Sequence, residues 1–200
     1  MHITADHWLS TARRCPSPFF NERPAGEISL VVLHNISLPP GQFGGPWIDQ
    51  LFSGTLASEG HPYFAEIHGM EVSAHLLIRR DGEVVQYVPF DARAWHAGRS
   101  CYQGRENCND FSIGIELEGC DDQPFDDRQY DSLHDVLRAI WMRYPDTREA
   151  LTGHSDIAPG RKTDPGPSLD WERVRAQPRR RGDDEFCGES SGDDSGRTGR

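Results

Sequence analysis

The amino-acid sequence predicts a single α/β domain over residues 1–177, in which helices flank a central mixed β-sheet. Three observations favour this fold. Residues 28–34 are a nearly continuous apolar and β-branched run, Asp81-Gly82 separates two strand-like segments, and residues 126–144 carry apolar side chains at helical spacing. Residues 178–200 are arginine, glycine, serine and acidic residues with almost nothing to bury, so we predict a disordered tail there.

The first third of the chain contains one strong strand signal and several weaker elements. Residues 1–26 are rich in proline and predict a covering loop. Residues 28–34 predict a strand buried on both faces, because the apolar run does not alternate. Short helices are expected at 47–52 and 61–68, but residues 36–72 as a whole are long for a connection and indicate a functional excursion.

The middle of the chain predicts three strands. Residues 73–79 and 83–88 are strand-like and the Asp81-Gly82 turn joins them as a hairpin. Residues 111–118 alternate as a strand does. One face of this strand carries Ile113, Ile115 and Leu117, and the other carries Gly114, Glu116 and Glu118.

The C-terminal third predicts a long helix, a strand and a short helix. In residues 126–144 the apolar positions recur at helical spacing, and Pro145 ends the helix. Residues 151–157 begin as a strand and pass into a loop that reaches Pro167, and residues 168–175 predict the last helix. There are no internal repeats.

Composition narrows the function classes. The net charge of -11 argues against a nucleic-acid partner, and no apolar run is long enough to span a membrane. The N-terminus lacks the basic start and apolar stretch of a signal peptide, so we expect a cytoplasmic protein. We also expect a monomer. The cysteines are odd in number and follow no metal or disulfide spacing, which indicates free thiols. They are Cys15, Cys101, Cys108, Cys120 and Cys187.

Two of the nine histidines stand out as candidate metal ligands. His34 and His154 each follow an apolar, strand-like segment and open a polar loop, where α/β proteins place active-site groups. Asp164 follows His154 ten residues later, and two histidines with one carboxylate would give zinc three ligands and an open fourth position. His75 and His96 could be satisfied core histidines or could line a groove.

Five blocks of sequence resemble the N-acetylmuramoyl-L-alanine amidases of the AmpD type, which are related to T7 lysozyme and the peptidoglycan recognition proteins. The resemblance runs from about Trp8 to about Trp171, with the blocks in the family's order. The blocks are Val-Leu-His-Asn-Ile-Ser-Leu-Pro-Pro-Gly (32–41), Ser-Ala-His-Leu-Leu-Ile-Arg-Arg-Asp-Gly (73–82), Arg-Ala-Trp-His-Ala-Gly (93–98), Cys-Asn-Asp-Phe-Ser-Ile-Gly-Ile-Glu-Leu-Glu-Gly (108–119) and Gly-His-Ser-Asp-Ile-Ala-Pro-Gly-Arg-Lys-Thr-Asp-Pro-Gly-Pro (153–167).

The resemblance implies a reaction, a metal and roles for particular residues. It implies hydrolysis of the amide bond between the lactyl group of 1,6-anhydro-N-acetylmuramic acid and L-alanine, in soluble muropeptides of peptidoglycan recycling. It implies one zinc ion per chain on His34, His154 and Asp164, with Glu116 and Lys162 as the catalytic pair. Positions in or near the blocks are candidates for substrate binding: Asn35, Tyr63, Trp95 and His96.

The chemistry of these residue types fits those roles but leaves alternatives. Glu116 could move a proton from water to the departing amine, and the neighbouring Gly114 would leave room for ligand. It could instead be a solvated outward carboxylate, and Glu118 on the same face is the rival base. Lys162, the only lysine in the chain, suits a developing oxyanion. Tyr63 and Trp95 could equally be core aromatics.

Some features depart from the family or allow other functions. Glu71 and Asn107 stand where some members have arginines linked to stem-peptide carboxylates, and Arg99 or Arg105 could substitute. The alternative functions are an amidase of intact murein and a non-catalytic peptidoglycan sensor. A cysteine hydrolase that uses Cys101 or Cys120 with His96 is also compatible with the composition.

Overall fold

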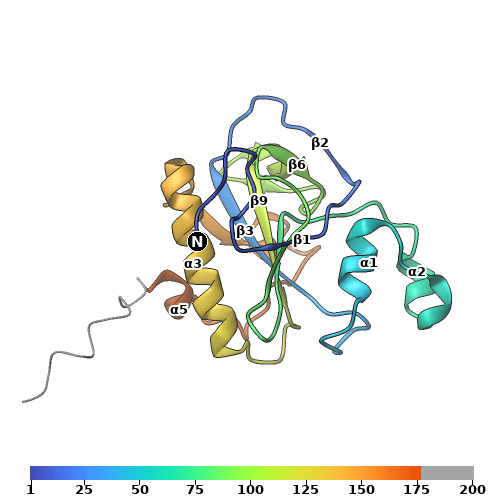
Figure 1. Cartoon of the computed structure of the whole chain (residues 1–200). Coiled ribbons are helices and arrows are strands. Elements are labelled where there is room, and N and C mark those ends of the chain that lie inside the picture. Colours follow the sequence, from blue (N-terminus) through green and yellow to red (C-terminus); the bar gives the residue numbers. More distant parts are fainter. Residues whose placement is uncertain (177–200) are drawn as a thin grey trace, which may run out of the picture.

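A six-stranded mixed sheet lies at the centre of the structure, a computed structural model in which residues 1–176 are described (Figure 1). Neighbouring strands pair in parallel, except for the antiparallel pair β4–β5. The prediction of a mixed sheet in an α/β domain is confirmed, whereas the predicted tail lies outside the described residues. The strand order is β1 (Arg13–Arg14), β5 (Val84–Gln86), β4 (Leu76–Ile78), β9 (Ser112–Glu118), β3 (Leu30–Ile36) and β10 (Leu151–Gly153).

The two longest strands, β3 and β9, lie side by side in the interior of this sheet. The first five residues of β3 are buried, as its continuous apolar run predicts. All seven residues of β9 are buried as well. The alternation in β9 therefore does not mark a face in contact with water, and the interpretation of Glu116 as a solvated carboxylate is wrong.

Helices cover both faces of the sheet (Figure 1). The long helix α3 (Asp127–Arg143) packs on one face, where it meets Val31 and Leu33 of β3 and the three apolar residues of one face of β9. A capping box begins this helix. The Asp126 side chain accepts the Arg128 N–H, and the Gln129 side chain accepts the Asp126 N–H. The prediction of a helix that ends at Pro145 is confirmed.

The segment 36–72 contains α1 (Trp47–Ser53), the 3-10 turn η1 (Ser58–Gly60) and α2 (Phe64–Ile67). Apolar residues of both helices form a second core with Leu77 and Val85 of the sheet. This segment is therefore also part of the scaffold, which the sequence did not indicate. The short helix α1 agrees with the predicted 47–52, and α2 is shorter than the predicted 61–68.

Several short elements were missed or shortened in the sequence interpretation. β1 and β2 (Phe20–Glu22) lie in the predicted covering loop, and β2 pairs with β6 (Ala92–Ala94). Such strands of two or three residues depend on their partners and leave little pattern in the sequence. The remaining elements are β7 (Cys101–Tyr102), β8 (Arg105–Glu106), η2 (Cys108–Asp110), η3 (Pro145–Thr147), α4 (His154–Ile157) and α5 (Trp171–Arg175).

Two further observations concern membrane spans and thiols. Within residues 1–176, no helix has both the length and the apolar character needed to cross a membrane. Four cysteines lie in this range, and all four are free thiols as predicted. Cys187 lies outside the described residues.

Candidate active site

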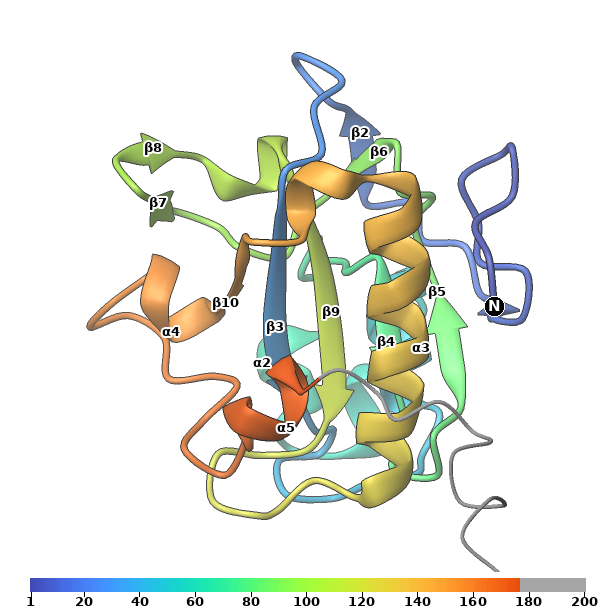
Figure 2. The same ribbon diagram turned by 90° about the vertical axis from the view of Figure 1, so that its left-hand side faces the viewer.

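Three functional residues lie at or just after the carboxyl ends of neighbouring parallel strands, β10, β3 and β9. Figure 2 shows these three strands side by side. His34 lies near the end of β3 and is the register partner of Glu116 in β9. On the other side of β3, Leu33 pairs with Gly153, so His154 leaves β10 beside His34. Ligand sites of open α/β sheets form at this edge, because the strands end there and loops begin.

His34, His154 and Asp164 converge through one atom each. The Nδ1 atoms of His34 and His154 are 3.0 Å apart, and each lies 3.0 Å from Oδ2 of Asp164. Both histidines are buried, at 2 % and 3 % exposure. The structure thus brings together the three residues that the sequence named as metal ligands, in a cluster that could hold an ion.

The donor set fits zinc. Bonds of about 2.0–2.1 Å in a tetrahedral site separate the ligand atoms by about 3.3 Å, close to the 3.0 Å observed here. Two imidazole nitrogens and one carboxylate oxygen are ligands that zinc accepts readily. Since two facing Nδ1 atoms cannot both carry a proton at this distance, a cation between the three atoms would satisfy all of them.

Burial favours a neutral imidazole at His34. Burial lowers the pKa of His34 to about 4, although the hydrogen bond to Asp164 acts in the opposite direction. The His154 Nε2–H donates to the Ala97 carbonyl at 3.1 Å, which leaves the Nδ1 lone pair directed at the cluster. The Nδ1 atoms of both rings therefore face the cluster.

The loop that carries Asp164 is tied to the neighbouring elements. The Ser155 N–H donates to the Asp164 carbonyl at 2.8 Å. The Asn35 amide donates to the Pro165 carbonyl at 3.0 Å and to Oδ1 of Asp121 at 2.7 Å. Asn35, a candidate for substrate binding, thus uses its amide N–H groups to hold the ligand loop.

Glu116 is a buried carboxyl without a hydrogen-bond donor for one of its oxygens. Its exposure is 8 %, and within residues 1–176 no donor satisfies Oε2. Burial raises the pKa of Glu116 well above its usual range, the charge of Asp164 acts in the same direction, and Lys162 opposes both. A carboxyl with a raised pKa and a free oxygen is suited to proton transfer.

Glu118, the rival base, is engaged in holding the scaffold. Its Oε1 accepts the Gly44 N–H at 2.7 Å and its Oε2 accepts the Arg80 N–H at 3.1 Å. The Arg79 guanidinium lies 3.7 Å from Oε1. Both oxygens are therefore occupied, and of the two carboxyls on this face Glu116 is the one available for chemistry.

Lys162 lies in the exposed loop between α4 and Asp164. Its backbone N–H donates to the Ala158 carbonyl at 3.1 Å, which keeps the loop close to the end of α4. Its positive charge acts on both Glu116 and His34, because it lowers the pKa of each. The lysine is thus near the cluster and has its side chain exposed.

His96 lies behind the cluster. Its Nδ1 is 2.9 Å from His34 Nε2, and its Nε2 is 3.1 Å from the Ser112 hydroxyl. The ring also fills the space above Gly114, where an added Cβ would lie 2.4 Å from His96 Cγ. The expectation that Gly114 leaves room for ligand is therefore wrong, because the imidazole occupies that room.

The same contacts oppose a cysteine hydrolase. Both ring nitrogens of His96 are engaged by His34 and Ser112. His75 is a satisfied core histidine: it accepts the Gly114 N–H at Nδ1 and contacts the Ala92 carbonyl through Nε2. Among residues 1–176, no cysteine sulfur is hydrogen-bonded to a histidine.

The two aromatic candidates for substrate binding are half-buried. Tyr63 packs against the second core beside α2. Trp95 donates its indole N–H to Asn21 Oδ1 at 2.7 Å and stacks against Phe19 with ring centroids 6.3 Å apart. Each ring leaves part of its surface exposed, so a substrate-binding role stays a prediction.

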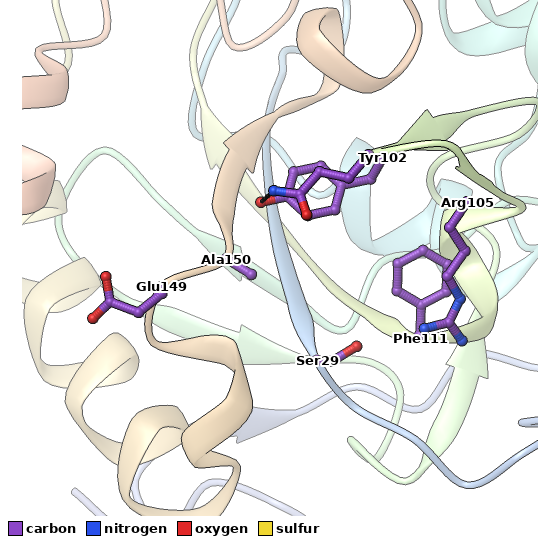
Figure 3. Close-up of a pocket in the computed structure, with 7 residues that line it drawn as sticks. Ser29, Tyr102, Arg105, Phe111, Glu149 and Ala150 are labelled. Atoms are coloured by element: carbon purple, nitrogen blue, oxygen red, sulfur yellow. Dashed lines mark hydrogen bonds between the residues drawn. The ribbon is translucent and has the colours of Figure 1, made fainter.

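A pocket of about 390 Å³ lies near the start of β3 (Figure 3). His34 lies near the other end of that strand. The lining of the pocket includes Ser29, Tyr102 and Arg105. The Arg105 guanidinium is paired with both oxygens of Glu27 at 2.7 and 2.8 Å and lies 3.8 Å from the Phe111 ring centre. These contacts disfavour Arg105 as a substitute for a peptide-binding arginine. Asn107 has a φ of 59°, a conformation that asparagine tolerates better than most residues.

Comparison with known proteins agrees with this geometry. The sequence profile of the N-acetylmuramoyl-L-alanine amidases (Amidase_2) matches residues 24–167. The 1,6-anhydro-N-acetylmuramyl-L-alanine amidase AmpD of Escherichia coli (strain K12) is 64% identical over 169 residues, which make up 84% of this chain and 92% of that protein.

Solved structures of amidases also resemble this chain. The crystal structure of a selenomethionine derivative of AmpD matches with a TM-score of 0.87 and 62% identity, over 88% of this chain and 99% of that one. The amidase AmiD from E. coli, solved in complex with its substrate anhydro-N-acetylmuramic acid-L-Ala-D-gamma-Glu-L-Lys, matches with a TM-score of 0.56 and 31% identity. That match covers 75% of this chain and 57% of the AmiD chain.

Proposed function

This chain belongs to the N-acetylmuramoyl-L-alanine amidase family, and from that premise we propose that it is a zinc-dependent hydrolase of soluble muropeptides. The bond cleaved joins the lactyl group of 1,6-anhydro-N-acetylmuramic acid to L-alanine. We further propose that it acts as a cytoplasmic monomer in peptidoglycan recycling, with one zinc per chain and without nucleic-acid or membrane partners. The observation that carries the proposal is the convergence of His34, His154 and Asp164 beside Glu116.

An amide is a poor electrophile with a poor leaving group, so the site must activate water, stabilise an oxyanion and protonate nitrogen. When bound by His34, His154 and Asp164, zinc supplies a Lewis acid that polarises the carbonyl and lowers the pKa of its water to about 7. The residues around it then have to move protons and balance charge.

Glu116 is the proposed proton carrier. Its carboxylate takes a proton from the attacking water and delivers it to the amide nitrogen as the C–N bond breaks. Burial supports this assignment, because a raised pKa makes the carboxyl both a better base and a group that can hold the proton until the amine leaves. The partnerless Oε2 leaves an acceptor free for that proton.

Lys162 is the proposed stabiliser of the oxyanion. An ammonium group offers a compact positive charge and three donors. The exposed position of Lys162, beside the buried cluster, would allow the ammonium to meet a substrate carbonyl that approaches from solvent.

Substrate recognition is proposed for the half-buried aromatics Tyr63 and Trp95, whose exposed ring surface suits a sugar ring. For Asn35 and His96 we propose indirect roles instead. Their polar atoms bond to the ligand loop and to His34, so they would act on substrate through the metal site.

The test is hydrolysis of anhydro-N-acetylmuramyl-peptide by purified protein before chelation, after chelation and after zinc is restored. Cleavage at the lactyl–alanine bond that chelation abolishes and zinc restores would support the proposal. Zinc binding without cleavage would contradict it and favour an amidase of intact murein or a sensor, and murein would then be the next substrate tested.

A further inference from the structure

The two candidate ligand histidines are held from behind by consecutive residues. The Nε2 of His34 lies 2.9 Å from the Nδ1 of His96. The Nε2–H of His154 donates to the carbonyl of Ala97, the next residue, at 3.1 Å. Each ring must present Nδ1 to the cluster, so each must carry its proton on Nε2 and needs an acceptor there. The dipeptide 96–97 supplies both acceptors.

The Ser112 hydroxyl lies 3.1 Å from Nε2, on the far side of the His96 ring. A hydroxyl can accept the Nε2–H, and in that tautomer Nδ1 is the lone-pair nitrogen toward His34. The ring cannot move toward β9, because it already touches Gly114 closely enough to exclude a Cβ there. Its orientation is thus determined by contacts on both sides.

One buried side chain holds the dipeptide. The Asn109 Oδ1 accepts the His96 N–H at 3.2 Å and the Ala97 N–H at 2.8 Å. Asn109 is 7 % exposed, and its own carbonyl accepts Nη1 of the buried Arg23 at 3.1 Å. Two successive N–H groups bound to one oxygen fix the two peptide groups on either side of the His96 Cα, and with them the root of the His96 side chain. The Ala97 carbonyl begins the next peptide group, where it also accepts Nη2 of Arg161 at 2.7 Å.

We infer that Asn109 is a positioning residue for the metal site: through the His96–Ala97 dipeptide it sets the tautomer and orientation of both His34 and His154. The inference rests on the proposed zinc function. Asn109 lies in η2, between β8 and β9, and by the bonds above it acts on the ligands only through the dipeptide. Asn109 is neutral, so we expect its loss to change the geometry of the ligand rings and not their charge.

The test compares zinc dissociation constants, measured by competition with a chromophoric chelator, for folded variants. Asn109→Ala removes the shared acceptor and should weaken zinc binding about 10- to 100-fold, as loss of groups behind metal ligands does. Asn109→Asp keeps an acceptor oxygen at the same place and should recover most of the affinity.

Gln86→Ala is the matched control. Gln86 is also a buried carboxamide that accepts a backbone N–H, from Leu9 at 2.6 Å, but it contacts the N-terminal segment. Its loss should lower the melting temperature and leave the zinc affinity unchanged. An equal loss of affinity in Gln86→Ala, or none in Asn109→Ala, would overturn the inference.

Asn109→Ser takes the place of Asn109→Ala if the latter does not fold. Its shorter side chain leaves the oxygen too far from the two N–H groups to hold both, so zinc binding should again weaken, and wild-type affinity would overturn the inference. If the wild type binds no zinc, the proposed function fails together with the inference. If the wild type binds zinc and the folded Asn109 variant binds it equally well, the inference alone fails.

Discussion

His34 on β3 and Glu116 on β9 are register partners in adjacent parallel strands, and both side chains lie on the sheet face opposite α3. A candidate metal ligand and a candidate proton carrier therefore come from the rigid centre of the sheet, and only Asp164 and Lys162 come from a loop. The pairing of β3 with β9 places residues 34 and 116 side by side. The distance between these two residues therefore does not depend on the conformation of a loop.

Glu116→Gln should lower kcat by about 10²–10⁴-fold, the usual contribution of general acid–base catalysis, with zinc content and melting temperature close to wild type. Steady-state hydrolysis and metal analysis would measure this. Glu118→Gln is the matched control, since its carboxylate accepts the Gly44 and Arg80 N–H groups. It should cost stability, about 1–3 kcal/mol, with turnover largely kept. The reverse pattern would show that Glu118 is the base.

Asp164→Asn should lose zinc and turnover together, because it removes the only anionic ligand of the cluster. Metal analysis after dialysis should fall from one zinc per chain to well below that. Asp170→Asn is the control: Asp170 caps α5 by accepting the Arg173 N–H, and asparagine caps equally well. Full zinc content in Asp164→Asn would rule out the ligand assignment.

Lys162→Ala should lower kcat by about 10²–10³-fold, as loss of one oxyanion donor does, with a small change in KM. Lys162→Arg should recover part of the rate, because it restores the charge but not the compact ammonium. Arg175→Ala, an exposed cation on α5, is the control and should act like wild type. An increase in KM alone would assign Lys162 to substrate binding instead.

A chain that ends after residue 177 should hydrolyse anhydro-muramyl-peptide at the wild-type rate. The family profile ends at residue 167, and the alignment with the E. coli relative spans 84% of this chain. The two proteins would be compared by kcat/KM and melting temperature. A large loss of either value would mean that residues 178–200 take part in the domain.

Acid should remove the stabilising contribution of Glu27. Hydrogen bonds from Arg105 and then Ser29 lower the pKa of Glu27 to about 2. A carboxyl with a depressed pKa stabilises the fold above its unfolded value of 4.5 and loses that contribution as the pH falls toward 2. The pair is exposed, so the contribution is at most about 1 kcal/mol. Urea unfolding should show a free energy of unfolding for wild type above that of Glu27→Gln at pH 6, with a gap that narrows below pH 4.5 and closes near pH 2; a constant gap would contradict the assignment.

Much of the scaffold is readable from local patterns. The apolar run at 28–34, the turn at Asp81-Gly82 and the amphipathic repeat of 126–144 predict β3, the β4–β5 hairpin and α3, and the structure confirms all three. Such elements are encoded by neighbouring residues. The missed strands β1, β2 and β6–β8 are two or three residues long. β1, β2 and β6 form because a distant segment provides the hydrogen-bond partner, and β7 and β8 form a hairpin too short to leave a pattern.

Some features of the candidate site could likewise be predicted from the sequence, and others could not. Residue type and family resemblance in the sequence identified His34, His154, Asp164, Glu116 and Lys162, because metal ligands and proton carriers are restricted to a few side chains. Residue type alone could not separate Glu116 from Glu118, which share a strand face, although the family resemblance implied Glu116. The tertiary structure adds a physical difference, because Gly44 and Arg80, from other parts of the chain, donate to Glu118, whereas Oε2 of Glu116 has no partner within residues 1–176.

The sequence by itself therefore determined the fold class, the family and the reactive residue types, all of which depend on local pattern. The tertiary structure determined which residues contact the reactive ones. The His96 ring lies within hydrogen-bond distance of His34, and Asn109 accepts the N–H groups of the His96–Ala97 dipeptide. Both roles arise from hydrogen bonds and packing between segments far apart in the chain, which no local pattern encodes.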